Sequence, residues 1–234
     1  PRIITVPPPL MPEALASGEV DAFCVGEPRG SVAVDRGAGV LLLPTSAIWQ
    51  AAPEKVLAVR AGWAEAEPDL AGRLLRALWR AGRWLAQPAN LSVAGEILAA
   101  PGRLDTSADL IERSLTGRLV VAADGREVQV PGFLQFHDGA AGFPWRSQAA
   151  WIGARLAARH GLDPDAARIA AARCFRSDLY RHYLAPVGAD LPAASVKLEG
   201  SLAVPTPVDS SRGRLILPPD RFYDAQVFDP GLPG

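Results

Sequence analysis

A short turn near the start of the chain, Gly26-Glu27-Pro28, could bind a small anion. Gly26 and Glu27 end a short apolar run, and Pro28 follows them. Glycine lets a ligand approach the main chain closely, and proline suits the first turn of a helix. Such a turn presents unpaired N–H groups and the positive end of a helix, which attract an anion. The same residues also suit an ordinary turn between a strand and a helix, so both interpretations stay open here.

Lys55 is the charged residue that could complete this anion site. It precedes the apolar run Val56–Val59, where its ammonium group could face a bound anion. A lysine at such a position is also commonly a plain surface residue, and the local pattern does not choose between the two. Arg146 could likewise bind an anion or pair with a carboxylate, and pairing is the favoured interpretation.

The composition is that of a globular protein with a hydrophobic core. The chain has 234 residues, a formal net charge of -1 and 49% hydrophobic residues, enough for one or two domains. The near-neutral charge gives no electrostatic basis for binding nucleic acid or an anionic membrane surface. No apolar run approaches the roughly 20 residues of a membrane-spanning helix. Cys24 and Cys174 stand among apolar residues and are expected to be buried, with their oxidation state open.

Patterns typical of enzymes and metal sites do not occur. The three histidines, His137, His160 and His182, lack the spacing of metal ligands. The sequence has no serine-hydrolase elbow, no P-loop and no zinc-protease motif. Cys24 has neither a second cysteine nor a base beside it. We therefore expect no catalytic residue, no metal and no cofactor.

The apolar pattern predicts an α/β chain with short strands between helices. Strands are expected at Ala22–Val25, Val40–Leu43 and Val56–Val59, where apolar runs are bounded by turn formers. Strands joined through helices favour a parallel sheet. Ligands in such sheets bind at the carboxyl ends of strands, beside helix N-termini. The expected turn at Gly26 would lie at such an end.

Start and stop signals predict the helices. They are expected at residues 10–17, 31–36, 62–66, 68–86, 91–99, 106–115, 147–159, 164–173 and 177–184. Thr106 and Ser147 are expected as N-caps. Asp124-Gly125 predicts a hairpin between Leu119–Val121 and Glu127–Val130. The chain after Pro186 is rich in proline, glycine and serine, and predicts an extended tail that wraps the domain or is mobile.

Four stretches carry a resemblance to a known family. They are Val6–Met11, Leu15–Ala22 followed by Gly26-Glu27-Pro28, Pro53–Arg60, and Phe143–Ser147. In this order they resemble the nitrate- and bicarbonate-binding branch of the solute-binding proteins of bacterial ABC importers. The likeness runs from about Arg2 to about Tyr183, and more loosely to Pro230. It implies a type 2 periplasmic-binding-protein fold, an α/β fold with two lobes and a hinge.

The resemblance also implies how the chain is divided. Residues 1–55 would hold the remainder of the second lobe and the hinge, with the ligand turn. Residues 56–185 would form the first-lobe strand and helices, and 186–234 a Pro/Gly-rich C-terminal tail. The matching segment is internal in the family. The N-terminal part, which supplies most of one lobe and some pocket residues, is therefore expected to be missing from this sequence.

The family resemblance assigns roles to Gly26 and Lys55. Nitrate binders contact the oxyanion through the glycine of Gly-Glu-Pro and the lysine of Pro-Glu-Lys, which match Gly26, beside Glu27, and Lys55. Bicarbonate binders have an acidic residue and calcium at the lysine position, so Lys55 implies nitrate or nitrite. Two departures affect the pocket rim and lobe packing: Arg29 replaces an aromatic residue, and Arg159-His160-Gly161 replaces a basic-Trp-Gly element.

The implied function is reversible, non-enzymatic capture of nitrate or nitrite by cleft closure. The protein would be periplasmic or membrane-anchored and deliver its ligand to an ABC permease. The alternative is a cytoplasmic nitrate sensor that controls an RNA-binding antiterminator, which Phe143–Ser147 and Asp178–Arg181 also resemble. Bicarbonate or sulfonate binding is less favoured. So is an enzyme like the thiamine-pyrimidine synthases, which need a cysteine-rich motif. Neither main role involves direct nucleic-acid binding or membrane insertion.

Overall fold

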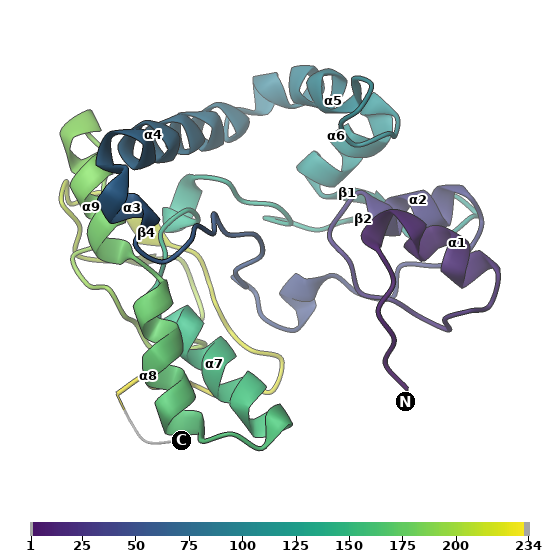
Figure 1. The fold of residues 1–234 in the computed structure, drawn as a ribbon. Helices are drawn as coiled ribbons and strands as arrows, with labels where there is room; N and C mark the ends of the chain where they lie inside the picture. The colour runs from purple at the N-terminus through teal and green to yellow at the C-terminus, as the bar shows by residue number, and fades with distance from the viewer. Residues whose placement is uncertain (1, 232–234) are drawn as a thin grey trace. The chain divides into compact units, whose positions relative to one another are not determined.

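The computed structural model describes residues 2–231 and forms two compact units (Figure 1). Unit 1 comprises Pro1–Pro44 and Leu85–Gln135, and unit 2 comprises Thr45–Trp84 and Phe136–Gly234. The chain passes from one unit to the other and back, so each unit is discontinuous in the sequence. The boundaries expected at residues 55 and 185 therefore do not coincide with the boundaries of these units.

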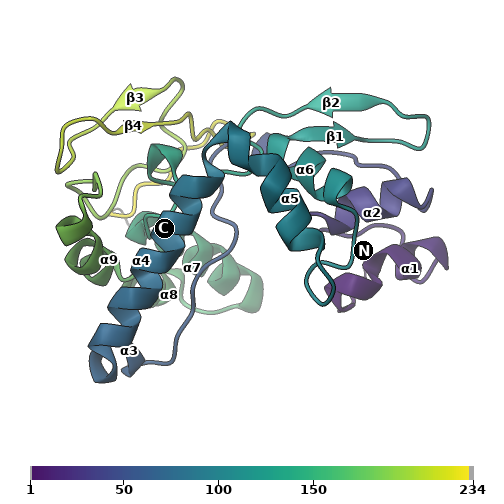
Figure 2. The same ribbon diagram turned by 90° about the horizontal axis from the view of Figure 1, so that it is seen from above.

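Unit 1 consists of short helices and one hairpin. Its elements are α1 (Met11–Ala16), α2 (Arg29–Asp35), α5 (Leu91–Ala99), α6 (Ala108–Thr116), β1 (Arg118–Val120), β2 (Glu127–Gln129) and the 3-10 turns Pro8–Leu10 and Pro88–Asn90. Helices α5 and α6 lie side by side (Figure 2). Gly95 permits this contact, because a Cβ there would lie 2.9 Å from the carbonyl oxygen of Ala108. The hairpin pairs Leu119 with Val128 across the expected Asp124-Gly125 turn.

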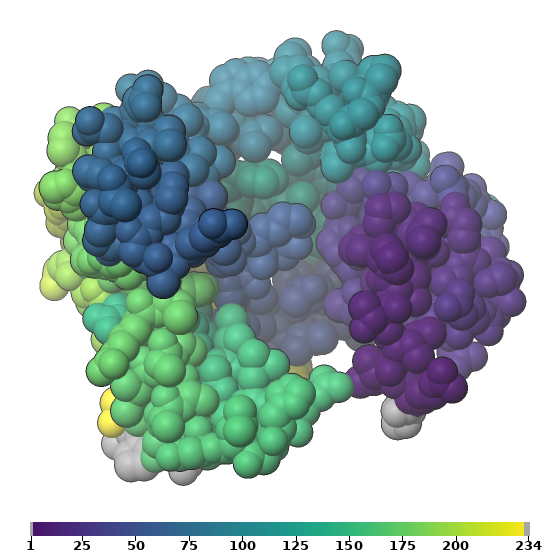
Figure 3. All heavy atoms as spheres, in the orientation of Figure 1, coloured from purple at the N-terminus to yellow at the C-terminus, as the bar shows by residue number. Residues whose placement is uncertain are grey.

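Unit 2 contains the longer helices. Its elements are α3 (Trp63–Ala66), α4 (Pro68–Leu85, whose last residue falls in unit 1), α7 (Arg146–His160), α8 (Pro164–Cys174), α9 (Ser177–Leu184), β3 (Thr206–Pro207), β4 (Ile216–Leu217) and the 3-10 turns Thr45–Ala47, Asp138–Ala140 and Ala185–Val187. Helices α7 and α8 pack along each other and form one continuous surface (Figure 3). Gly153 of α7 allows this approach, because a Cβ there would lie 2.6 Å from the Cβ of Ala171.

Aromatic side chains fill much of the core of unit 2. Trp49, Trp151 and Phe222 form a cluster with ring centroids 4.8 to 5.2 Å apart. Phe143 and Trp145 are two residues apart in the sequence and both are buried. Their rings meet edge to face, with centroids 4.9 Å apart. Such contacts combine a large buried apolar area with a preferred ring geometry. The core therefore joins residues from both sequence segments of this unit.

The predicted helices form close to their expected bounds, but two N-caps were wrong. Ser107, not Thr106, caps α6, and its side chain accepts a hydrogen bond from the Leu110 N–H at 3.3 Å. Ser147 is not a cap, because Trp145 occupies the N-cap position of α7. The Ser147 side chain is instead fully buried and bonded elsewhere. Asp163 caps α8, since its side chain accepts the N–H of Asp165 at 2.9 Å.

The three predicted strands are wrong as strands. Among the described residues, sheets form only from the two antiparallel pairs β1–β2 and β3–β4. Residues 22–25, 40–43 and 56–59 lie outside helices and strands, and large apolar side chains there are exposed, including Leu42 at 82% and Val56 at 61%. An apolar run predicts extended backbone, whereas a strand also needs a neighbour that the run itself does not specify.

The C-terminal segment packs onto unit 2. Leu191, Leu217 and Phe222 are buried, and the Ser211 N–H donates to the Leu191 carbonyl at 2.9 Å. The tail was expected either to wrap the domain or to be mobile. Its described part wraps unit 2 and has little regular structure. Residues 232–234 of the expected tail lie outside the described residues.

Both cysteines also depart from expectation. Cys24 and Cys174 are exposed and free rather than buried. Within the described part of the chain, every helix is too short or too polar to cross a membrane.

Candidate functional site

Gly26 and Glu27 lie in the turn that leads into α2. The Gly26 carbonyl accepts a hydrogen bond from the Arg29 N–H at 3.4 Å, which closes the turn. The φ angle of Gly26 lies outside the left-handed region, so the turn does not require glycine for its backbone angle. Within residues 2–231, the N–H groups of Gly26 and Glu27 donate to no protein acceptor. Two adjacent backbone donors are thus left for solvent or a ligand.

The carboxylate of Glu27 faces the protein. Its Oε2 accepts the backbone N–H of Ser31 at 3.1 Å, which satisfies one of the N–H groups that the start of a helix leaves open. Burial raises the pKa of Glu27 above its usual range, while hydrogen bonds from Ser31 and Ser114 act in the opposite direction. A Cβ at Gly30 would lie 2.9 Å from the Glu27 Oε1. The Glu27 side chain therefore stabilises the start of α2, and only its backbone N–H is left to face a ligand.

Lys55 lies in unit 2, on an extended segment rather than at the mouth of a strand. Its ammonium group donates to both carboxylate oxygens of the neighbouring Glu54, at 2.5 and 2.7 Å. The two side chains are 74% and 52% exposed. An ion pair this exposed contributes little free energy and exchanges readily with other partners. The Lys55 ammonium is accordingly accessible to an anion.

Arg146, the other candidate for anion binding, does not pair with a carboxylate in the described part of the chain. Its Nε donates to the Ala172 carbonyl at 3.1 Å, and no ion pair to Arg146 occurs among residues 2–231. The expected pairing with a carboxylate was therefore wrong. Arg146 instead links the start of α7 to the last turn of α8.

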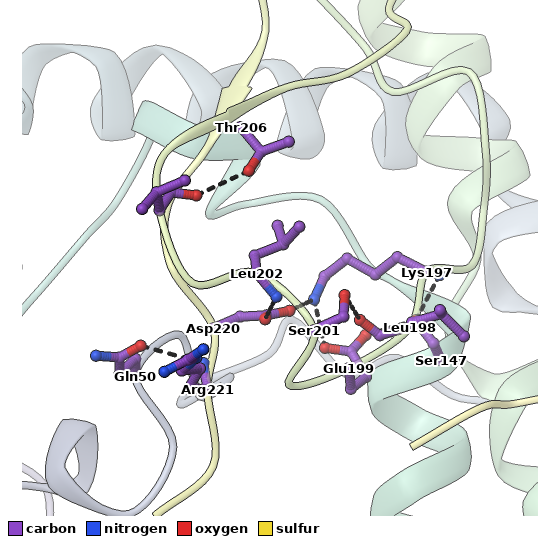
Figure 4. A network of polar contacts seen from close by, with 11 residues as sticks. Gln50, Ser147, Lys197, Leu198, Glu199, Ser201, Leu202, Thr206, Asp220 and Arg221 are labelled. Atoms are coloured by element: carbon purple, nitrogen blue, oxygen red, sulfur yellow. Dashed lines mark hydrogen bonds and ion pairs between the residues drawn. The ribbon is translucent and has the colours of Figure 1, made fainter. Parts of the chain in front are cut away.

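A buried polar network in unit 2 was missed by the sequence analysis (Figure 4). It comprises Ser147, Lys197, Glu199 and Asp220. The Lys197 ammonium donates to the Glu199 Oε2 at 2.5 Å and also to the Asp220 Oδ2. The Ser147 hydroxyl donates to the Glu199 Oε1 and accepts the Lys197 N–H at 3.1 Å. Asp220 accepts the Leu202 N–H at 2.8 Å.

This network holds one positive charge between two negative charges in a dry environment. Glu199 is 0% exposed and Asp220 is 1% exposed. Burial raises the pKa of Glu199, and Lys197 opposes that rise. The spacing of Lys197 and Glu199 on an extended segment was a local signal, because residues two apart share one face. No local signal marked Asp220 or Ser147 as their partners.

Comparison with known proteins places these features in a family context. A model of the NMT1-like family matches residues 2–99. The nitrate/nitrite binding protein NrtA of Synechococcus elongatus is 31% identical over 236 residues, covering 99% of this chain and 48% of that protein. The bicarbonate-binding protein CmpA of the same species is 26% identical over 244 residues, covering 99% of this chain and 50% of that protein. This chain thus spans about half the length of the curated relatives it matches.

The fold agrees with a solved structure of the same group. The crystal structure of the periplasmic nitrate-binding protein NrtA from Synechocystis PCC 6803 superposes with a TM-score of 0.83, at 23% identity. The superposition covers 98% of this chain and 56% of that one. It confirms the expected fold class, that of the periplasmic binding proteins. The sequence matches confirm the resemblance carried by the four stretches.

Proposed function

We propose a function from one premise: this chain is similar over 99% of its length to the NrtA and CmpA binding proteins, and its residues 2–99 match the NMT1-like family. The proposed function is non-enzymatic, reversible binding of nitrate or nitrite. The observation that carries it is Lys55, whose ammonium group is exposed and has only the exposed Glu54 as a partner within residues 2–231. A monovalent oxyanion would need an accessible positive charge at this position, which matches the lysine of the nitrate binders.

Each proposed contact stands by itself: the backbone N–H groups of Gly26 and Glu27 lie in unit 1, and the Lys55 ammonium lies in unit 2. Each of these groups is a donor, and nitrate has three acceptor oxygens that share one negative charge. The two backbone donors have no protein acceptor within residues 2–231. Open backbone N–H groups bind anions without a further charged side chain. The Glu27 carboxylate has no direct part in the proposed contact, because it is held by the start of α2.

Lys55 also favours nitrate over bicarbonate. Bicarbonate binding in this family implies an acidic residue with calcium at the position of Lys55. A calcium site needs several oxygen ligands around one cation, and a lysine ammonium cannot be one of them. A lysine at this position repels a cation and attracts an anion directly.

The proposed partner is the permease of an ABC import system, with the protein on the periplasmic side of the membrane. Its relatives are described as nitrate, nitrite or bicarbonate binding proteins, which supports a role in uptake. The cytoplasmic sensor is the second candidate, favoured by the likeness of Asp178–Arg181 to the sensors. Fractionation of cells separates the two proposals: periplasmic recovery supports import, and recovery with cytoplasmic RNA-binding proteins supports sensing.

Titration calorimetry tests the binding proposal. Purified protein that includes the pocket residues expected upstream of Pro1 is titrated with nitrate, nitrite, and bicarbonate with and without calcium. Saturating heat with nitrate or nitrite, and none with bicarbonate, is the expected result. Chloride serves as the control, because it carries the same charge without the trigonal oxygens. Binding of bicarbonate alone, with no response to nitrate or nitrite, would overturn the assignment.

A further inference from the structure

We infer a second ligand site in unit 2, for an organic anion that joins a flat ring to a carboxylate or phosphate group. The site is a cavity of about 700 Å³, walled by α4, the 3-10 turn Asp138–Ala140, α9 and two stretches of the C-terminal segment. Cavities of this size hold small organic ligands. Nitrate would fill only a small part of it. Neither Gly26 nor Lys55 lines this cavity, so the inference does not depend on the proposed function.

Part of the cavity lining is aromatic and apolar. Trp79 of α4 meets His137 edge to face at 5.7 Å, and Tyr180 of α9 meets Phe143 edge to face at 5.6 Å. Leu191 and Leu215 complete this part. Burial lowers the pKa of His137 below its usual range, so the imidazole is neutral at pH 7 and adds an uncharged ring. A flat apolar group finds stacking and edge contacts on such a surface.

Three arginines also line the cavity. Arg83 comes from α4, and Arg212 and Arg214 come from the turn that precedes β4. All three are exposed, and within residues 2–231 none of them forms an ion pair. The Arg83 guanidinium lies 4.8 Å from the centre of the Trp79 ring. Guanidinium groups are suited to carboxylates and phosphates because their forked donors match two oxygens at once.

Asp190 does not neutralise these arginines through their side chains. Its Oδ1 accepts the backbone N–H of Arg212 at 2.8 Å, and its Oδ2 accepts the backbone N–H of Arg214 at 3.1 Å. The carboxylate is thus committed to the main chain of the turn. A Cβ at Gly188 would lie 2.7 Å from the Arg212 Nη2, so a glycine leaves room for that guanidinium. The remaining acidic residue of the lining is Asp138, which is exposed.

The two parts of the lining together define the chemical class of the ligand. An inorganic anion would engage only the arginines, and a neutral ring would engage only the aromatic and apolar lining. A ring with an attached anion satisfies both parts. The turn that carries Arg212 and Arg214 is held before any ligand arrives, which reduces the conformational entropy lost on binding.

Titration calorimetry with two probes and two fragments tests the inference. Adenosine monophosphate supplies a ring with phosphate, and benzoate supplies a ring with carboxylate. Adenosine and inorganic phosphate are the matched fragments. At least one probe is expected to bind about tenfold or more tightly than either fragment. The probe that binds identifies phosphate or carboxylate as the preferred anion. If neither probe binds at concentrations up to about 1 mM, the inference is overturned.

Paired arginine variants locate the binding. Arg83→Gln and the double variant Arg212→Gln/Arg214→Gln should each lower the affinity for the probe that binds by about tenfold. Arg80→Gln and Arg221→Gln are the controls, because both arginines are exposed in unit 2 and neither lines the cavity. Nitrate affinity should stay unchanged in all four variants, and thermal melts confirm that each is folded. Equal probe affinity in the cavity variants and the wild type would show that the probe binds elsewhere.

Discussion

The Ser147 hydroxyl donates a 2.5 Å hydrogen bond to Glu199, which follows it by 52 positions in the chain. Ser147 lies in the first turn of α7, and Glu199 lies in the C-terminal segment. Both side chains are fully buried. This one contact anchors a segment that has little secondary structure of its own. The contact adds to the backbone hydrogen bonds of the segment, among them the one from the Glu199 N–H to the Phe228 carbonyl at 3.0 Å.

Replacing Lys197 with methionine should destabilise unit 2 strongly. Without the ammonium group, Glu199 and Asp220 face each other as buried carboxylates. Removing one partner of a buried charge network typically costs about 3–5 kcal/mol of the free energy of unfolding. The loss should shrink in acid, where a carboxylate takes up a proton. Urea unfolding at neutral and acidic pH measures both effects. Ser201→Ala, at an exposed hydroxyl, is the control and should change stability by less than about 0.5 kcal/mol.

Limited proteolysis should cleave the segment from Leu191 to Phe222 slowly in the wild type. These two residues are buried, and the segment between them carries the network of Lys197, Glu199 and Asp220. Cleavage requires local opening, so its rate follows the stability of the segment. In Lys197→Met the same segment should become the first site cut, as mapped by mass spectrometry. Rapid cleavage there in the wild type would mean that the side-chain network does not hold the segment.

Glu27→Gln should flatten the dependence of stability on pH. The pKa of Glu27 in the folded protein is raised above the ordinary value of 4.5 by burial. The folded state then holds the proton more tightly than the unfolded state. This tighter proton binding by Glu27 stabilises the folded protein fully below that ordinary value. The stabilisation is lost as pH rises through the folded-state pKa. Glutamine keeps an oxygen that can accept the Ser31 N–H and has no charge to bury.

The measurement is the free energy of unfolding from about pH 4 to pH 7. As pH rises, the free energy of unfolding of Glu27→Gln should increase relative to that of the wild type. Glu19→Gln, at an exposed position in the same unit, is the matched control. If both variants follow the wild type in parallel, Glu27 has an ordinary pKa in the folded protein.

Lys55→Glu should lower nitrate affinity by at least about tenfold while the melting temperature changes little. The substitution replaces attraction with repulsion at the proposed contact, and screening by salt limits the effect. The side chain is 74% exposed, so the fold loses no packing. Arg60→Glu reverses another exposed charge of the same extended segment and should leave affinity nearly unchanged. Unaltered nitrate binding in Lys55→Glu would make Lys55 an ordinary surface lysine.

Gly153→Ala should destabilise the pairing of α7 with α8. A Cβ at this position would lie 2.6 Å from the Ala171 Cβ and 2.8 Å from the Ala167 carbonyl oxygen. Alanine raises helix propensity by about 1 kcal/mol, but overpacking costs about 1–3 kcal/mol. Thermal melts should show a net loss. Adding Ala171→Gly should recover only part of it, because the Ala167 carbonyl remains; full recovery or a stabilised single variant would contradict this packing.

The helices could be predicted from the sequence because their signals are local. Pro68 starts α4 and Asp163 caps α8 as the residue types indicate, and α5 has the predicted bounds, Leu91–Ala99. Each of these signals acts within a few residues of the element that it delimits. The expected hairpin follows the same logic, since the turn at Asp124-Gly125 brings neighbouring strands together.

Most of the errors concern features that depend on distant partners. The apolar run at Val40–Leu43 indicated a strand, but strand formation needs a second chain segment in register. Ser147 had the residue type of an N-cap, yet its hydroxyl is bound to Glu199 far along the chain. At the candidate site, the sequence identified Gly26 and Lys55 only through the family resemblance. The inward orientation of the Glu27 carboxylate has, in contrast, a local cause, the Ser31 N–H four residues on, which was missed by the sequence analysis.

The chain contains two lysines, Lys55 and Lys197, and they differ sharply in chemical accessibility. The Lys55 side chain is 74% exposed, whereas that of Lys197 is 15% exposed and enclosed by two carboxylates. An amine-directed reagent should therefore modify the Lys55 side chain in the native protein and reach Lys197 after unfolding. Because acylation of the amine removes its positive charge, the labelled protein should bind nitrate more weakly, as Lys55→Glu should. The rate at which Lys197 is labelled would measure how fast the C-terminal segment opens.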